Sequence, residues 1–418
     1  MPDRTTPPPF RPIERPQLHW PAAAALKPGI PLFVLHAGTQ PIVKLELVFD
    51  AGTWYEPHAG VAYVTAKMLL EGTQHRNAQA IASTIDQYGA SLSIHVQPDT
   101  WHLTLVTLSK HLGPMLTLVA ELLLAPAFPA ARLAHLKHRQ IQALRVANEK
   151  NSVVARQRFH ETLFGSTHPY GRSLTEETLA AITLAQVQHY YEHQLLAGCQ
   201  IFVSGQVPDT VLQTIQQQLQ PLPVQAPQPM PAFGPLPAPA PVQVPKPGSL
   251  QAALHLGQVL VPISHPDYLP LRVVIALLGG YFGARLMRNL REEKGYTYGI
   301  SARIVPLRYA SYLSIATEVI QAHAQAAVQE IEQEIKTLQT VPVLGAELQT
   351  LRHYLLGQWL ATTHDPFASM ERFKAVHLQG LDQTYYTQWY DTLMHLRPLQ
   401  LLALAQQYFT GLSHVVVG

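Results

Sequence analysis

The chain has 418 residues, too many for one ordinary hydrophobic core, which favours two domains of about 200 residues each. A hydrophobic fraction of 47% is ample for buried interiors, while a net charge of +2 without any run of Lys or Arg argues against a nucleic-acid partner. The single cysteine, Cys199, excludes an internal disulfide framework, and we interpret it as a buried structural thiol.

The sequence pattern predicts neither a signal peptide nor a membrane-spanning segment. Residues 1–21 are rich in proline and contain no apolar core of signal-peptide length. No stretch reaches the roughly 18–20 uninterrupted apolar residues of a membrane-spanning helix. We therefore expect a cytoplasmic protein without a membrane partner, or a periplasmic one if a leader was removed.

In the first half, strands are expected before helices. Alternating or continuous apolar patterns predict strands over residues 31–35, 44–50, 91–96, 101–109 and 201–205. Helical spacing predicts helices over residues 60–70 and 77–89 and over most of 111–195. Asn77 is the expected N-cap of the second helix, and Gly89 its stop.

A proline-rich segment, residues 220–248, marks the clearest boundary in the chain. So many prolines are incompatible with a helix or a central strand and favour an extended, semi-rigid spacer. We therefore predict an N-terminal domain over 22–219, a linker over 220–248 and a C-terminal domain over 249–418.

The second half repeats the plan of the first. Strands are predicted over residues 251–260, 298–305, 311–317 and 414–418, with a helix over 268–278 and further helices from 321 onward. Each half also ends its sheet with a helix followed by a short β-branched strand, which indicates an internal duplication. The predicted fold class is α+β, with two homologous domains, each an antiparallel-rich sheet with helices packed on one face.

Several segments then occur together in one order. Residues 51–53 (AGT) precede residues 60–73 (GVAYVTAKMLLEGT), and residues 168–172 (HPYGR) come later. In the second half, residues 279–286 (GGYFGARL) precede residues 290–299 (LREEKGYTYG). The set resembles the pitrilysin/insulinase family of zinc peptidases, which includes the mitochondrial processing peptidases and bacterial two-subunit relatives. The resemblance spans nearly the whole chain and implies the half-clamshell fold of that family.

The zinc motif of that family is degenerate here. In the family, His-x-x-Glu-His supplies two zinc ligands and the glutamate that activates the bound water, and a later glutamate is the third ligand. The matching positions hold Tyr63, Ala66 and Lys67, and the third ligand falls at Ala143 or Leu144. Because a protonated lysine repels Zn²⁺, the resemblance implies that this chain binds no metal and hydrolyses no peptide alone.

A second segment matches the zinc motif by letters only. His189, Glu192 and His193 have the same spacing, so a relocated zinc site is one interpretation. However, no Glu occurs between Glu192 and Glu292 to complete it, and the corresponding helix of the second half carries no such motif. We interpret this segment as a surface helix.

The second-half motif is intact. Relatives place an Arg and a Tyr in this segment beside the zinc of the opposite half or partner, and the matching residues here are Arg291 and Tyr298. A guanidinium and a phenol can bind substrate carbonyls and the oxyanion that forms as water attacks. A surface ion pair for Arg291 and strand packing for Tyr298 are the structural alternatives.

Nearby residues also have structural interpretations. Arg285 either contributes to the site or holds its loop in place. Gly279, Gly280 and Gly283 follow an apolar helix rather than a strand, and no Walker lysine is present, so a phosphate-binding loop is not expected. Residues 168–171 are expected to form a turn that orders the loop between helices.

These observations leave two hypotheses about function. The first is a non-catalytic subunit of a heterodimeric zinc endopeptidase, in which zinc lies on a homologous partner chain and Arg291 and Tyr298 bind an unfolded peptide. The second is a peptide-binding or scaffold protein with no proteolytic role.

Overall fold

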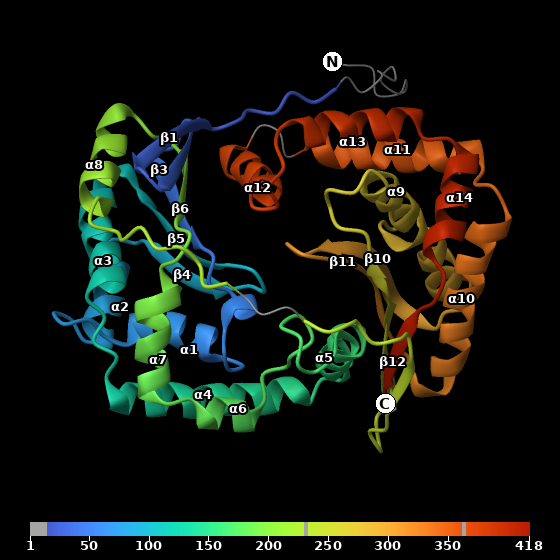
Figure 1. The fold of residues 1–418 in the computed structure, drawn as a ribbon. Helices are drawn as coiled ribbons and strands as arrows, with labels where there is room; N and C mark the ends of the chain where they lie inside the picture. Colours follow the sequence, from blue (N-terminus) through green and yellow to red (C-terminus); the bar gives the residue numbers. More distant parts are fainter. Residues whose placement is uncertain (1–14, 230–232, 362–364) are drawn as a thin grey trace, which may run out of the picture.

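The computed structural model describes residues 15–229, 233–361 and 365–418 (Figure 1). These residues form two β-sheets, each with its own layer of helices, which confirms the predicted α+β fold with two similar domains. Most of residues 1–21, on which the targeting expectation rests, and residues 230–232 of the expected linker lie outside the described residues.

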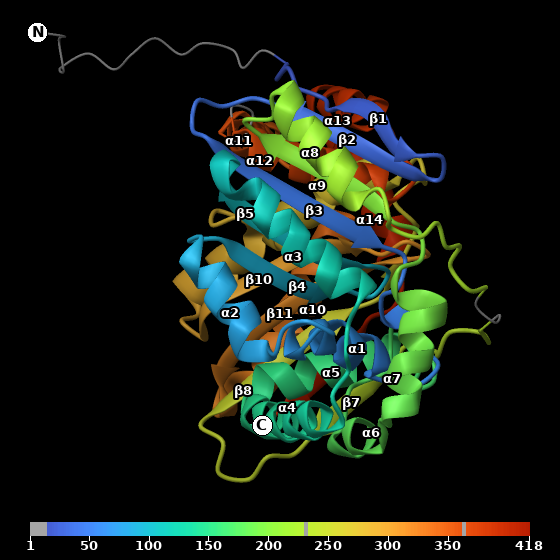
Figure 2. The same cartoon turned by 90° about the vertical axis from the view of Figure 1, so that its left-hand side faces the viewer.

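The first sheet has the strand order β1-β2-β6-β3-β5-β4, in which only β2 and β6 are parallel neighbours. Its strands are β1 (Ala22–Lys27), β2 (Ile30–His36), β3 (Ile42–Phe49), β4 (Ser91–Val96), β5 (Trp101–Leu108) and β6 (Gln200–Gly205). The helices of this half are α1 (Val61–Met68), α2 (Ala78–Gln87), α3 (Leu112–Leu124), α4 (Ala130–Asn148), α5 (Asn151–Phe164), α6 (Glu176–Ala181), α7 (Leu184–Tyr190) and α8 (Asp209–Leu219). Helices α3 and α8 lie across the outer face of the sheet (Figure 2).

The second sheet has the order β10-β11-β8-β12-β7, and the short β9 pairs with β11. Its strands are β7 (Pro241–Val244), β8 (Gln251–Gly257), β9 (Val259–Leu260), β10 (Thr297–Pro306), β11 (Ser311–Ile320) and β12 (Ser413–Val417). The helices are α9 (Tyr268–Gly279), α10 (Ala324–Thr340), α11 (Gly345–Leu360), α12 (Pro366–His377), α13 (Thr384–His395) and α14 (Pro398–Tyr408). Short helical turns include the π-helical η4 (Tyr191–Leu195) and η5 (Met287–Glu293).

The two sheets repeat one topology. Strands β2, β6, β3, β5 and β4 of the first sheet occupy the same order as β7, β12, β8, β11 and β10 of the second. The parallel pair also recurs, because β7 runs parallel to β12 as β2 does to β6. Strand β7 lies inside the proline-rich segment, where an edge position tolerates Pro241. The second sheet therefore begins before residue 249, the boundary that composition indicates.

Helices α5 and α12 occupy equivalent places in the two halves, and each covers the sheet of the other half. Phe159 of α5 stacks on His255 of β8, with 3.9 Å between the ring centroids. Phe373 of α12 packs on Phe33 of β2 at 4.9 Å. Figure 1 shows α12 beside the first sheet and α5 beside the second. Helices thus cover the outer faces as expected, and one exchanged helix covers each inner face.

Candidate functional site

Helix α1 carries the degenerate motif and starts at a buried carboxylate. Gly60 is its N-cap with φ of 92°, a left-handed conformation that favours glycine. The Glu56 carboxylate accepts hydrogen bonds from the backbone N–H groups of Gly60 at 3.0 Å and Ala62 at 3.2 Å. Burial nevertheless raises the pKa of Glu56 to about 7, against the opposing effects of these bonds and of Arg172. The start of the helix is therefore defined by a buried acid rather than by a metal.

The side chains at the motif positions on α1 either form hydrogen bonds within the chain or are buried. Tyr63 donates its hydroxyl to Gln140 Oε1 at 2.9 Å. Lys67 donates its ammonium to the backbone oxygen of Ile94, on the edge strand β4, at 2.7 Å. Ala66, at the position of the general base, is completely buried. Burial and the nearby charge of Arg139 lower the pKa of Lys67.

The two candidate positions for the third ligand, Ala143 and Leu144, differ in burial. Both residues lie on α4, where Ala143 is exposed and Leu144 is half-buried against the core of the first half. Leu144 follows Gln140 by one helical turn, so the two share the face that contacts Tyr63 of α1. A hydrocarbon therefore occupies the place of the carboxylate ligand.

The two histidines of the letter-for-letter zinc motif contact each other. The rings of His189 and His193 stack with 4.2 Å between their centroids, and His193 Nδ1 contacts the backbone oxygen of His189 at 2.9 Å. Helix α7 ends at Tyr190, and the motif continues into the π turn η4. Across residues 15–229, 233–361 and 365–418, no three His, Cys, Asp or Glu side chains gather to hold a metal.

Arg291 lies on the π-helical turn η5. The wide turn is closed by a hydrogen bond from Lys294 N to Asn289 O at 2.9 Å. The Asn289 side chain donates to Glu330 at 3.1 Å and to Glu334 at 2.8 Å on α10, which fixes the turn to the domain. Single π turns of this kind frequently occur at functional sites.

Tyr298 lies on a second irregularity, a bulge at the start of β10. The register with β11 shifts between Thr297 and Ile300. The Thr297 hydroxyl accepts from Gly299 N at 3.0 Å and donates to Glu318 O at 2.7 Å, so the bulge is held by hydrogen bonds. Bulges re-aim side chains, and Tyr298 here is 90% exposed.

The structure brings Arg291 and Tyr298 together. The Arg291 guanidinium lies 5.1 Å from the Tyr298 ring centroid and 4.7 Å from that of Phe282, which is 61% exposed. Among the described residues, no ion pair or hydrogen bond of Arg291 is found, and no contact of this kind links it to Tyr63 or Lys67. The predicted surface ion pair of Arg291 is therefore absent from the described part of the chain.

Arg285 has a structural role. Its guanidinium binds the Glu347 carboxylate with two bonds, of 2.9 and 2.8 Å, and both side chains are mostly buried. The glycines before it permit close packing: a Cβ at Gly279 would lie 2.8 Å from Ala302 N, and one at Gly280 would lie 2.5 Å from Ala276 Cα. Close contact with strand β10 at Gly279 and with the preceding turn of α9 at Gly280 thus explains this glycine pair without a phosphate.

The loop at residues 168–172 orders its neighbours, as expected. Tyr170 donates to Asp99 Oδ1 at 2.6 Å, and Asp99 Oδ2 accepts from Arg308 N of the β10–β11 turn at 3.0 Å. Arg308 also donates to Asp50 Oδ1 at 2.6 Å. Sequence reasoning missed this junction between the halves because its members are far apart in the chain.

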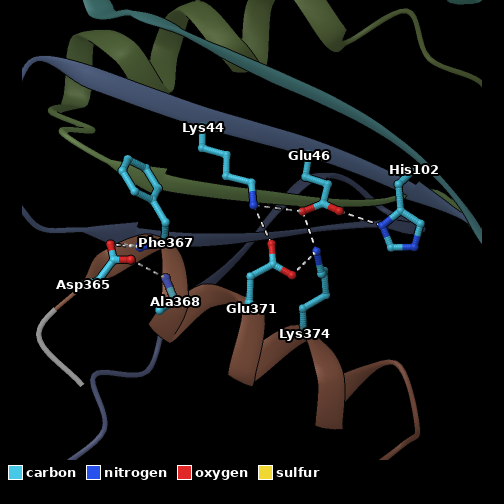
Figure 3. A network of polar contacts seen from close by, with 8 residues as sticks. All are labelled: Lys44, Glu46, His102, Asp365, Phe367, Ala368, Glu371 and Lys374. Carbon is cyan, nitrogen blue, oxygen red and sulfur yellow. Dashed lines mark hydrogen bonds and ion pairs between the residues drawn. The ribbon is translucent and has the colours of Figure 1, made fainter. Parts of the chain in front are cut away.

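A buried charge network was missed for the same reason (Figure 3). Glu46 of β3 accepts from Lys374 of α12 at 2.5 Å and contacts His102 of β5 at 2.6 Å. Burial favours the neutral acid, but the hydrogen bonds and charges of His102 and Lys374 prevail and lower the pKa of Glu46 to about 2. The network borders a cleft of about 510 Å³ between the first sheet, α12 and the β10–β11 turn. It ties α12 to the sheet that this helix covers.

Comparisons with known proteins identify the class to which this fold belongs. The model described as Insulinase (Peptidase family M16) matches residues 32–178, and the model described as Peptidase M16 inactive domain matches residues 181–355. The chain belongs to peptidase family M16.

Individual relatives are distant but cover most of the chain. A protein of Helicobacter pylori named non-peptidase homolog YmxG is 23% identical over 71% of this chain and 70% of its own length. One of Bacillus subtilis named uncharacterized zinc protease YmxG is 20% identical over 75% and 76%. A solved structure of a peptidase M16 inactive domain from Pseudomonas fluorescens superposes with a TM-score of 0.86 at 23% identity, covering 95% of this chain and 98% of that one.

Membrane insertion finds no support in the described helices. None of them combines the length and the apolar character that crossing a bilayer requires.

Proposed function

We propose that this chain is the non-catalytic subunit of a heterodimeric zinc endopeptidase. Its partner is a homologous chain with an intact His-x-x-Glu-His motif, which holds the zinc. This chain supplies Arg291 and Tyr298 to bind the substrate backbone and the oxyanion next to that zinc.

One observation carries the proposal: the two motifs of the chain differ in the availability of their polar groups. At the degenerate motif, Tyr63 and Lys67 donate to groups of the same chain. At the second motif, Tyr298 is 90% exposed and the Arg291 guanidinium contacts only aromatic faces among the described residues. Donors that are fixed in place and left free are what an oxyanion site requires.

The substrate is an unfolded peptide that adds a strand to a sheet edge. Strands β4 and β10 each lie at one edge of a sheet, opposite the edges formed by β1 and β7, and each pairs on one side only among the described residues. Peptides often bind such edges through main-chain hydrogen bonds. Tyr298 lies at the start of β10, so a strand added there passes the proposed donors.

Partner-dependent hydrolysis tests the proposal. The chain is mixed with the purified partner, and cleavage of a quenched fluorescent peptide is followed. We expect the mixture to be active and each chain alone to be inactive. Removing one oxyanion donor costs about 10²-fold in kcat, so Arg291→Ala and Tyr298→Phe should each lower cleavage to that extent. The exposed Lys336 on α10, away from the edge strands, provides the control, Lys336→Ala. Activity that ignores both substitutions contradicts the shared site.

A binding or scaffold protein without proteolysis is the second candidate. The name of the Helicobacter pylori relative, a non-peptidase homologue, favours it. This function predicts peptide binding by the chain alone and no hydrolysis with any zinc-bearing homologue from the same organism. Activity in the mixing experiment therefore excludes it.

A further inference from the structure

Phe282 is the third member of the exposed group at the second motif. Its neighbours in the loop are anchored: the Tyr281 ring lies 5.0 Å from that of Tyr354, and Arg285 forms its bidentate pair with Glu347. Phe282 alone projects, 61% exposed, with its ring facing the Arg291 guanidinium at 4.7 Å. Packing of the domain does not account for a large apolar ring in this position, whereas contact with Arg291 does.

Arg291 also differs from the cations around it in its ion pairing. Arg285 and Arg288 pair with Glu347, and Lys294 pairs with Glu330 at 3.1 Å. Arg291 has no carboxylate partner in the described part of the chain, and neither Glu292 nor Glu293 forms an ion pair with it. In the described part of this surface, the Arg291 guanidinium therefore differs from Arg285, Arg288 and Lys294 in lacking an ion-pair partner.

Stacking against rings leaves the hydrogen-bonding edge of a guanidinium free. The aromatic faces of Phe282 and Tyr298 attract the cation but accept no conventional hydrogen bond from its N–H groups. The planar fork of five donors matches a carboxylate with two parallel bonds. A ring on each neighbouring segment restricts the side chain, so less rotamer entropy is lost when the ligand binds.

We propose that Phe282, Arg291 and Tyr298 form a binding site for a carboxylate of a peptide ligand. Arg291 binds the carboxylate, and the two rings position its guanidinium. The carboxylate belongs either to the C-terminus of the peptide or to an acidic side chain. The inference rests on the proposed function only in taking a peptide as the ligand.

Binding of three labelled peptides to the full-length chain tests the site. All share one unstructured sequence: the first has a free C-terminal carboxylate, the second a C-terminal amide, and the third an amide plus one internal glutamate. Fluorescence anisotropy gives their dissociation constants. We expect a carboxylate-bearing peptide to bind about tenfold more tightly than the neutral amide, as for a charged hydrogen-bonded pair. A preference for the first peptide assigns the C-terminus, and a preference for the third assigns the side chain. Equal affinity for all three overturns the proposal.

Variants assign the preference to this site. Arg291→Ala should abolish it, and Phe282→Leu should reduce it several-fold, because Leu keeps the bulk but lacks the aromatic face. Tyr298→Phe keeps the ring and should retain the preference, and Lys336→Ala, the exposed control on α10, should leave it unchanged. A preference that survives Arg291→Ala overturns the assignment. Phe282 and Arg291 are both partly or largely exposed, so these changes are not expected to impair folding.

Failure of this inference is distinguishable from failure of the proposed function. Tyr298→Phe removes the phenol that the oxyanion role needs, so it should lower partner-dependent hydrolysis while leaving carboxylate binding intact. If Arg291→Ala abolishes hydrolysis although the chain shows no carboxylate preference, the inference falls and the subunit role stands. If the chain shows an Arg291-dependent preference for the carboxylate but no mixture hydrolyses the peptide, the inference stands and the subunit role falls.

Discussion

The polar groups of the first half and those around Arg291 differ in where they find their partners. In the first half, Tyr63, Lys67 and Glu46 are satisfied by groups of the same chain, and Glu46 is satisfied across the junction of the halves. Around Arg291, the donors are fixed by aromatic rings and by an irregular backbone but remain available. The difference separates polar groups that maintain the fold from polar groups that can bind another molecule.

Breaking the buried pair between Lys374 and Glu46 should have the largest effect on stability. Lys374→Met removes the cation at 2.5 Å from the buried Glu46 carboxylate and leaves only Lys44 at 3.9 Å, and breaking a buried pair of this kind costs about 3–5 kcal/mol in the free energy of unfolding. Urea unfolding measures it, with the exposed Lys336→Met on α10 as the control. A loss below about 1 kcal/mol, within the range of a surface pair, would mean that the junction is not maintained by this pair.

Lowering the pH should reduce the free energy of unfolding through the same network. The pKa of Glu46 is lowered from 4.5 to about 2 in the folded chain, so the unfolded chain binds the proton more readily. The contribution of Glu46 is therefore fully present above pH 4.5 and is lost as the pH falls toward 2. A shift of this size corresponds to about 3 kcal/mol. Unfolding free energies between pH 5 and pH 2.5 should show a steeper decline for the wild-type chain than for Glu46→Gln; parallel curves would contradict the assignment.

Restoring the zinc ligands tests whether another feature, besides the missing ligand side chains, weakens metal binding by the first half. The graft Tyr63→His, Ala66→Glu, Lys67→His and Leu144→Glu supplies the ligand set, but the charge of Arg139 acts on both α1 positions. We expect the graft that also carries Arg139→Gln to bind Zn²⁺ about tenfold more tightly, since removing a nearby cation lowers the electrostatic cost. Competition with a chromophoric chelator measures the affinity. The same affinity with and without Arg139 would show that its charge is irrelevant.

The smallest change in stability is expected for Arg291→Ala. Because its guanidinium has no ion-pair partner in the described part of the chain, Arg291→Ala should change the unfolding free energy by no more than about 0.5 kcal/mol. Arg285→Ala is the matched comparison and should cost about 1–3 kcal/mol, because it breaks the mostly buried pair with Glu347. If Arg291→Ala is as destabilising as Arg285→Ala, Arg291 belongs to the fold rather than to a binding surface.

Much of the fold follows from local sequence pattern. Residues 91–96 form β4 as predicted, and Asn77 caps α2 by accepting from Ala80 N at 2.9 Å. Local pattern is less informative where tertiary contacts decide. The expected strand over 251–260 divides at Gln258, whose backbone oxygen accepts from Leu313 N at 2.8 Å. Strand β7 and the exchange of α5 and α12 depend on contacts between residues roughly 100 to 340 positions apart, which periodicity does not record.

For the site, the sequence names the residues but not their geometry. The spacing of Arg291 and Tyr298 carries no sign of the π turn and the bulge that orient them. Phe282 had no predicted role, although it stands in the glycine-rich segment that the resemblance singles out. An exposed aromatic residue among glycines was the available signal. Conversely, the difference between the two candidate third-ligand positions, exposed Ala143 and half-buried Leu144, is visible only in the structure.

The exchange of α5 and α12 has a consequence for cutting the chain in two. A break in the proline-rich segment leaves each fragment with one sheet whose inner face has lost its helix and one helix whose sheet is gone. Each fragment alone exposes apolar surface, including Phe33 and Phe202 of the first sheet. Together, the fragments carry everything needed to restore both faces. The two halves are therefore suited to fragment complementation, provided that the break lies before β7, the strand that the proline-rich segment contributes to the second sheet.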